Sequence, residues 1–190
     1  MKLIACFAVA LILLLSGCAG KSGADNAVVP RPRAYPRVAE IGGEYRDTIV
    51  GGVTIPVNVN AVISSSRHDW LNVDYPGYRA TIYITVTAPQ ESDALDVAIA
   101  NRLERISLNV GGRRARTEEL ANAFGFHAVV TIVEEPSPLP FQFLAVSPDH
   151  RLLSGAVSLS GAIEPADSVA PVLRRLRDDV TNMIQNLELQ

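Results

Sequence analysis

The sequence contains few of the groups from which catalytic and metal sites are usually built. Its 190 residues include two cysteines, three histidines and one tryptophan, and aromatic residues make up 6% of the chain. The formal net charge is −3, and this acidic, mixed balance excludes the basic footprint expected of a nucleic-acid-binding protein. No serine lies within a Gly-x-Ser-x-Gly segment, so the chain also lacks the nucleophile elbow of the α/β-hydrolases.

The first 18 residues, MKLIACFAVALILLLSGC, contain both cysteines. Lys2 is followed by an apolar run, Leu3 to Leu15, which is shorter than the roughly 20 apolar residues of a transmembrane helix and has the length of a signal-peptide core. A cysteine after Leu-Ser-Gly resembles the lipobox of bacterial lipoproteins, in which the thiol receives a diacylglyceryl group and the cysteine becomes the new N-terminus. We therefore expect a lipoprotein signal peptide at residues 1–17 and a lipid anchor on Cys18. The alternatives are an ordinary cleaved signal peptide and an uncleaved anchor helix.

A lipidated and cleaved chain would have no free thiol. Cleavage removes Cys6 and acylation consumes Cys18, so disulfides, thiolate metal sites and cysteine nucleophiles are excluded from the mature protein. Several acyl chains on one cysteine would form a durable membrane anchor, because a single chain holds a protein only marginally.

A flexible and Pro/Arg-rich tether is expected to follow the lipidated cysteine, over residues 18–44. Within it, residues 28–38 read VVPRPRAYPRV, and each proline fixes its own φ and favours an extended residue before it. This segment is therefore expected to be a semi-rigid rod whose arginines could bind carboxylates or lipid phosphates and whose tyrosine could anchor in an apolar groove of a partner. The alternatives are a segment that lies back on its own domain and a plain linker. The candidate partner-binding residues are Arg31, Arg33, Tyr35 and Arg37.

Strand patterns dominate both halves of the remaining chain. Residues 45–64 have β character, interrupted by a predicted hairpin turn at Gly51-Gly52, with the valines of VNV facing the core and Asn58 facing away. WLNVDYP (70–76) and RATIYITV (79–86) alternate with period two and predict an antiparallel pair. Further along, residues 126–135 predict a strand, and residues 141–161 predict a hairpin with Pro148-Asp149 in its turn.

Helical patterns lie between and after these strands. Residues 91–108 carry an apolar stripe and open with Ser92 as a candidate N-cap, and residues 169–187 form the clearest amphipathic helix of the chain. A short helix is also expected from Thr117 to Gly125, because Glu118 and Glu119 would lie in its first turn. The order predicts an α+β fold: a single domain, residues 45–190, with a mainly antiparallel sheet of about five to seven strands and two to three helices packed on it.

Other polar residues lack the arrangement that a catalytic or metal site requires. The three histidines, His68, His127 and His150, have no metal-ligand spacing, and Ser64–Ser66 near His68 reads as a solvated loop rather than as a hydrolase site. Gly111-Gly112-Arg113-Arg114 is only a weak phosphate-loop signal. Three acidic pairs are interpreted as surface charge: Glu118-Glu119, Glu134-Glu135 and Asp178-Asp179. We therefore predict no catalytic residue, no metal site and no cofactor.

The proline- and arginine-rich rod, together with Tyr45, resembles the N-terminal signature of the gliding-motility lipoprotein D (GldD) family of Bacteroidetes, which reads Pro-basic-Pro-Arg-Gly-Tyr-aromatic-Arg. The matching residues are Pro30, Arg31, Pro32, Arg33, Tyr35 and Arg37. Ala34 stands where glycine is usual, and Pro36 stands where an aromatic residue is usual. Later segments resemble two strands, the late hairpin and the start of the last helix of that family: WLNVDYP, RATIYITV, FQFLAVSPDHRLLSGAVSL and DSVAPVL.

The resemblance implies a non-enzymatic, membrane-anchored lipoprotein that faces the periplasm and is an accessory component of the gliding motility and type IX secretion machinery. Its expected partners are a membrane, through the lipid on Cys18, and a protein of that assembly. Ala19 is not the aspartate of inner-membrane retention, and no acidic cluster follows it, which favours the outer membrane over the inner. Two other functions remain open: a periplasmic module that binds a small apolar or lipid ligand, and a serine or acid/base hydrolase.

Overall fold

The structure of the chain is a computed structural model that describes residues 42–89, 91–160 and 166–190. The chain divides into residues 1–35 and residues 36–190, and all described residues belong to the second unit. The predicted signal peptide, Cys18 and the rod at residues 28–38 therefore lie outside the described residues. The first strand begins at Tyr45.

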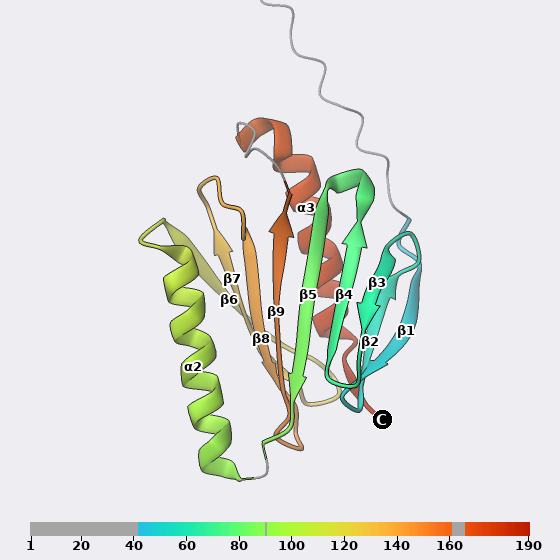
Figure 1. Cartoon of the computed structure of the whole chain (residues 1–190), viewed down its shortest axis with the longest axis vertical. Coiled ribbons are helices and arrows are strands. Elements are labelled where there is room, and N and C mark those ends of the chain that lie inside the picture. Colours follow the sequence, from blue (N-terminus) through green and yellow to red (C-terminus); the bar gives the residue numbers. More distant parts are fainter. Residues whose placement is uncertain (1–41, 90, 161–165) are drawn as a thin grey trace, which may run out of the picture. The chain divides into compact units, whose positions relative to one another are not determined.

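Two antiparallel sheets and two α-helices make up the described part of the chain (Figure 1). The larger sheet has the strand order β3-β4-β5-β9-β8-β7-β6, and the smaller has the order β1-β2-β10. The strands are β1 Tyr45–Val50, β2 Val53–Asn58, β3 Val62–Ser66, β4 Trp70–Tyr75, β5 Ala80–Thr87, β6 Ala115–Ala121, β7 His127–Val133, β8 Phe141–Val146, β9 Leu152–Leu159 and β10 Glu188–Leu189. The helices are η1 Pro76–Tyr78, α2 Ser92–Val110 and α3 Ala166–Gln185. The predicted α+β fold with a mainly antiparallel sheet is confirmed.

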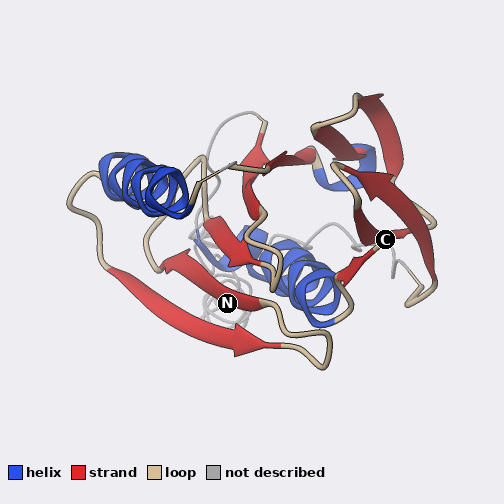
Figure 2. Cartoon of the chain, turned by 90° about the horizontal axis from the view of Figure 1, so that it is seen from below, coloured by secondary structure: helices blue, strands red, loops and turns tan. Residues whose placement is uncertain are grey.

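The apolar stripe of α3 fills the space between the two sheets. Its buried side chains are Leu176, Val180, Met183 and Ile184, and with the buried Leu187, just after the helix, they are called the α3 stripe below. They share one core with β2 and with the inner faces of the larger sheet, which curves around α3 when seen from below (Figure 2). Each fully buried aliphatic side chain contributes about 1.5–3 kcal/mol of transfer free energy, so this stripe is a main source of stability. The predicted amphipathic helix is confirmed.

Strand alternation places α2 on the opposite face of the larger sheet. On β8, Phe143 points into the α3 core, whereas the neighbouring Leu144 contacts α2. Leu144 forms a small cluster with Leu152 of β9 and Leu95 near the start of α2. The same alternation on β4 and β5 buries the predicted inward-facing residues: Leu71, Val73, Tyr75, Ile82, Ile84 and Val86. Helix α2 does not cover the whole of this face of the sheet, as the 47% exposure of Tyr83 on β5 shows.

The turn between β1 and β2 requires its two glycines. Gly51 and Gly52 have φ values of 57° and 73°, and a Cβ atom on Gly51 would lie 2.7 Å from the Cβ of Val86. The guanidinium group of Arg151, from the β8–β9 turn, donates a hydrogen bond to the Gly51 carbonyl. The predicted hairpin is confirmed, and its turn also connects the smaller sheet to the larger one.

The predicted short helix from Thr117 to Gly125 is wrong, because residues 115–121 form edge strand β6. All seven residues pair with β7, and Glu118 accepts hydrogen bonds of 2.7 and 2.9 Å from the guanidinium group of Arg177 on α3. Burial alone would raise the pKa of Glu118, but the hydrogen bonds from Arg116 and Arg177 outweigh it and lower that pKa. Glu118 therefore binds a neighbouring helix instead of opening one.

Three smaller predictions also fail. Asn58 is 1% exposed rather than solvent-facing, because its amide donates to the Gly42 carbonyl, while the neighbouring Val59 is 37% exposed. Ser64–Ser66 belong to edge strand β3 rather than to a loop. The residue before α2, Glu91, is the N-cap position instead of Ser92.

Candidate functional site

The residues singled out from the sequence do not converge in the structure. Cys18 and the four candidate partner-binding residues lie outside the described residues, so their placement stays a prediction. The histidines lie on separate segments: His68 precedes β4, His127 begins β7, and His150 lies in the β8–β9 turn with φ 66°. Within residues 42–89, 91–160 and 166–190, no group of three or more histidine, cysteine, aspartate or glutamate side chains is placed to hold a metal ion. The helices of this part include none with the length and apolarity needed to cross a membrane.

The glycine- and arginine-rich loop after α2 is built as a helix end. Gly111 donates from its backbone N–H to the Ser107 carbonyl, and Arg113 donates from its side chain to the Val110 carbonyl. Arg114 pairs with Glu134 at 2.7 Å. These contacts account for the loop without a bound phosphate.

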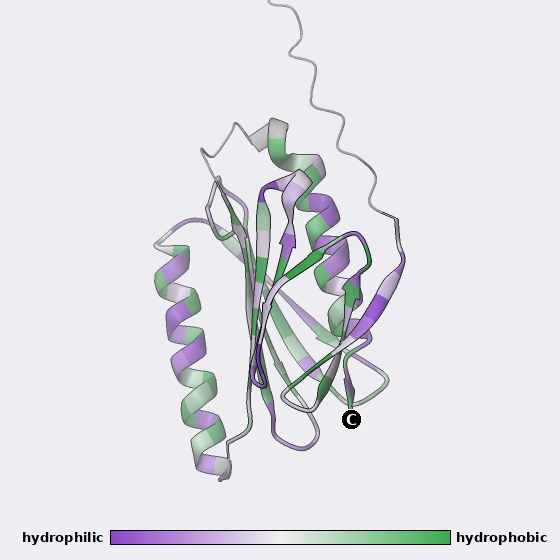
Figure 3. Cartoon of the chain, turned by 45° about the vertical axis from the view of Figure 1, so that its right-hand side comes forward, coloured by the Kyte–Doolittle hydropathy of each residue, from purple (hydrophilic) through white to green (hydrophobic). Residues whose placement is uncertain are grey.

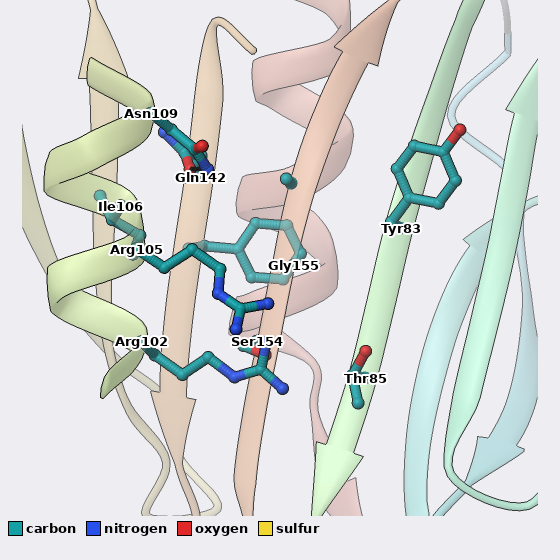
Figure 4. A pocket seen from close by; sticks show the side chains of 11 residues that line it. Tyr83, Thr85, Arg102, Arg105, Ile106, Asn109, Gln142, Ser154 and Gly155 are labelled. Atoms are coloured by element: carbon teal, nitrogen blue, oxygen red, sulfur yellow. Dashed lines mark hydrogen bonds between the residues drawn. The ribbon is translucent and has the colours of Figure 1, made fainter. Parts of the chain in front are cut away.

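A cleft between α2 and strands β5, β8 and β9 is the strongest candidate site in the described part of the chain. It encloses about 140 Å³, and its lining is mostly polar on the helix side and mixes long and short side chains on the sheet side (Figure 4). We call it the arginine cleft. It is lined by Tyr83, Thr85, Arg102, Arg105, Ile106, Asn109, Gln142, Phe143, Ser154, Gly155 and Ala156.

Two guanidinium groups dominate the electrostatics of this cleft. Arg102 and Arg105 lie three residues apart on α2, and both point from the helix toward Ser154 on β9 (Figure 4). Burial and the neighbouring Arg105 charge lower the pKa of Arg102. Neither arginine forms an ion pair with a carboxylate of the described residues, whereas Arg114, Arg116, Arg151 and Arg177 all do.

A buried amide lines the same cleft, at the end where Asn109 lies (Figure 4). Gln142 is 2% exposed, and its Oε1 accepts a hydrogen bond of 2.7 Å from Nδ2 of Asn109 on α2. Its Nε2 has no hydrogen-bond partner within the described residues. The sequence carries a signal for these residues that the sequence analysis missed. Gln142 is the one polar residue in the strand FQFLAV, and Arg102 and Arg105 share a helix face.

An apolar groove lies on the other side of α2, against β6, β7 and β8. It encloses about 380 Å³. We call it the apolar groove, and it is lined by Ile99, Leu103, Glu119, Leu120, Ala121, His127, Ala128, Val129, Leu144 and Val146. Apolar residues also reach the exposed side of α2, where Leu103 and Leu108 are 44% and 73% exposed (Figure 3). This groove is a mostly apolar space between sheet and helix.

Another polar cluster, around Asp179, connects α3 to the smaller sheet. Asp179 of α3 is 2% exposed, so its interpretation as surface charge is wrong. One of its oxygens accepts hydrogen bonds from the Tyr45 hydroxyl at 2.7 Å and from the Asn58 amide at 3.3 Å. Burial and then Asp179 raise the pKa of Tyr45 to about 12, with Arg175 acting in the opposite direction. The cluster joins the two hairpin strands of the smaller sheet to α3.

Because the pKa of Tyr45 is raised, the free energy of unfolding should fall with rising pH in the alkaline range. The folded state holds the Tyr45 proton more tightly than the unfolded chain, so this stabilisation is complete below pH 10 and is lost as the pH rises from 10 toward 12. Tyr45→Phe should destabilise the protein at pH 8 by about 1 kcal/mol and reduce the loss of stability between pH 10 and 12. Urea unfolding, followed by the fluorescence of the single tryptophan, measures both effects. Tyr83→Phe, which lies outside the cluster, is the control; equal pH profiles for the two variants would contradict the assignment.

One known protein family matches nearly the whole of the described part of the chain. The family described as gliding motility lipoprotein GldD matches residues 25–189. No curated protein matches the chain. The match includes both sheets and both α-helices, and it also includes the residues of the predicted rod.

Proposed function

Because the chain belongs to the gliding motility lipoprotein GldD family, we propose that it is a non-enzymatic accessory component of the gliding-motility machinery that acts by binding a partner at a membrane. The observation that carries this proposal is the family match over residues 25–189, which begins seven residues after Cys18, the cysteine of the predicted lipobox. In the finer proposal, acyl chains on Cys18 anchor the protein, preferably in the outer membrane, and the folded unit faces the periplasm. The same proposal assigns it to the type IX secretion assembly that accompanies gliding.

Lipidation of Cys18 is the first requirement of this function. Cys18→Ala should abolish incorporation of a labelled fatty acid, move the protein out of the membrane fraction and abolish complementation of a gliding-deficient deletion strain. The chain offers a matched control in Cys6→Ala, which changes the other cysteine and keeps the apolar run of the signal peptide intact. A Cys18→Ala protein that stays membrane-bound and fully active would contradict the proposal.

The Pro/Arg-rich rod is proposed as the segment that binds the protein partner. Arg31, Arg33 and Arg37 carry guanidinium groups that suit bidentate contacts with carboxylates, and Tyr35 supplies an apolar ring with a polar tip. The prolines reduce the conformational entropy that such a segment loses on binding. The partner is therefore expected to present acidic residues around an apolar groove.

A photo-crosslinking amino acid in place of Tyr35 tests this binding in cells. We expect one discrete adduct with a protein of the gliding or secretion assembly, identified by mass spectrometry. The same amino acid in place of Asp47, an exposed residue of β1, serves as the control and should give no adduct of that size. A Tyr35 variant that is folded, lipidated and active but yields no specific adduct would remove the rod from the proposed interface.

The apolar groove supports a second function, the binding of a small apolar or lipid ligand. Its size and its mostly aliphatic lining, with Glu119 and His127 as the two polar members, fit an acyl chain or a similar molecule. Native mass spectrometry of the protein, extracted in mild detergent, should then show a bound mass that Leu103→Asp removes. Leu108→Asp introduces the same charge on the same helix outside the groove and should retain the ligand. An empty wild-type protein would rule this function out.

A further inference from the structure

The arginine cleft holds more positive charge and more hydrogen-bond donors than its own residues use. Arg102 and Arg105 lie together without a carboxylate partner in the described part of the chain, although like charges this close repel each other. Four other arginines of the same part form ion pairs with acids, and several exposed arginines do not, but Arg102 and Arg105 differ from both groups because they line one cleft together. An anion between the two groups would remove the repulsion.

A buried donor points to the same conclusion independently. The Nε2 group of Gln142 has no partner within the described residues, and a buried amide left in this state is unfavourable. The amide is held in place because its oxygen accepts the hydrogen bond from Asn109, so Nε2 cannot turn away without breaking that contact. An acceptor bound in the cleft would satisfy this donor.

The floor of the cleft leaves room for a small group beneath the guanidinium groups. It is formed by the short side chains of Thr85, Ser154 and Ala156, which lie on the same face of β5 and β9. Two of these residues carry hydroxyl groups that can donate further hydrogen bonds. Tyr83, 47% exposed at the rim, presents an aromatic ring to whatever part of a ligand extends out of the cleft.

From this arrangement we propose that the arginine cleft is a binding site for an oxyanion, a carboxylate or a phosphate, carried by a small molecule or by a larger ligand that extends past Tyr83. A carboxylate or phosphate is rich in acceptor oxygens and fits the planar fork of a guanidinium group, so an oxyanion in this cleft would accept hydrogen bonds from the arginines and from the other donors that line it, Gln142 among them. A cation would be repelled, and a neutral apolar group would leave all three donors without partners. The site lies across α2 from the apolar groove and does not depend on the gliding role.

Calorimetric titration of the full-length lipoprotein in a neutral detergent tests the proposal. Inorganic phosphate and succinate are titrated separately, at an ionic strength held constant with sodium chloride, because salt screens these charges. We expect saturable binding of at least one of them, weakened at least tenfold by Arg105→Gln and by Arg102→Gln. The anion that binds more tightly identifies the oxyanion class. Arg174→Gln removes the same charge from an exposed position on α3 and should bind as the wild type does.

A second variant keeps the test informative if an arginine variant misfolds. Gln142→Glu places a carboxylate in the cleft that the two arginines line, and we expect it to abolish binding of both probes while raising the midpoint of thermal unfolding, since the new charge supplies the missing anion. The proposal is overturned if neither probe binds the wild-type protein, or if Arg174→Gln weakens binding as much as Arg105→Gln does. A Gln142→Glu protein that still binds both probes would also overturn it.

Discussion

The burial of the α3 stripe is the constraint on which the rest of the described structure depends. The two sheets are not hydrogen-bonded to each other as one sheet, and α3 supplies the apolar surface that both of them cover. Polar contacts then set the orientation of the helix: Asp179 binds Tyr45, Arg177 binds Glu118, and the Asn122 side chain donates to carbonyl groups at the end of α3. Such contacts add little net stability, but leaving the buried Asp179 carboxylate without a partner would be costly, so its contact with Tyr45 disfavours other orientations.

Helix α2 packs on the sheet through fewer buried residues than α3 does, and the candidate sites lie where this packing is incomplete. Its contact with the sheet is concentrated in the small cluster around Leu95, whereas α3 is enclosed by a continuous core. Cavities are left on both sides of α2: the arginine cleft toward β5 and β9, and the apolar groove toward β6 and β7. The larger sheet thus forms one wall of each cavity and helix α2 forms the other.

Local periodicity predicted most of the elements correctly because period two on β4 and β5 and period 3.6 on α3 both follow from one-sided burial. It failed where a partner distant in the chain decides the outcome. Thr117 and Glu118 look like the start of a helix, but pairing with β7 and the contact with Arg177 make this segment a strand. Asp179 looks like surface charge beside Asp178, and only the fold reveals that Tyr45 and Asn58 surround it.

The sequence by itself predicted the lipobox and the rod, which stay predictions. It also carried the resemblance to the family, which the comparison confirmed, and it predicted the α+β class. All of these depend on residues close together in the chain. The tertiary structure decided which polar residues converge. The arginine cleft joins α2 to strands β5, β8 and β9, which come from segments as far apart as Tyr83 and Ala156. No local pattern encodes such a meeting, because the strand order that brings β5 beside β9 is set by burial around α3 and not by neighbours in the sequence.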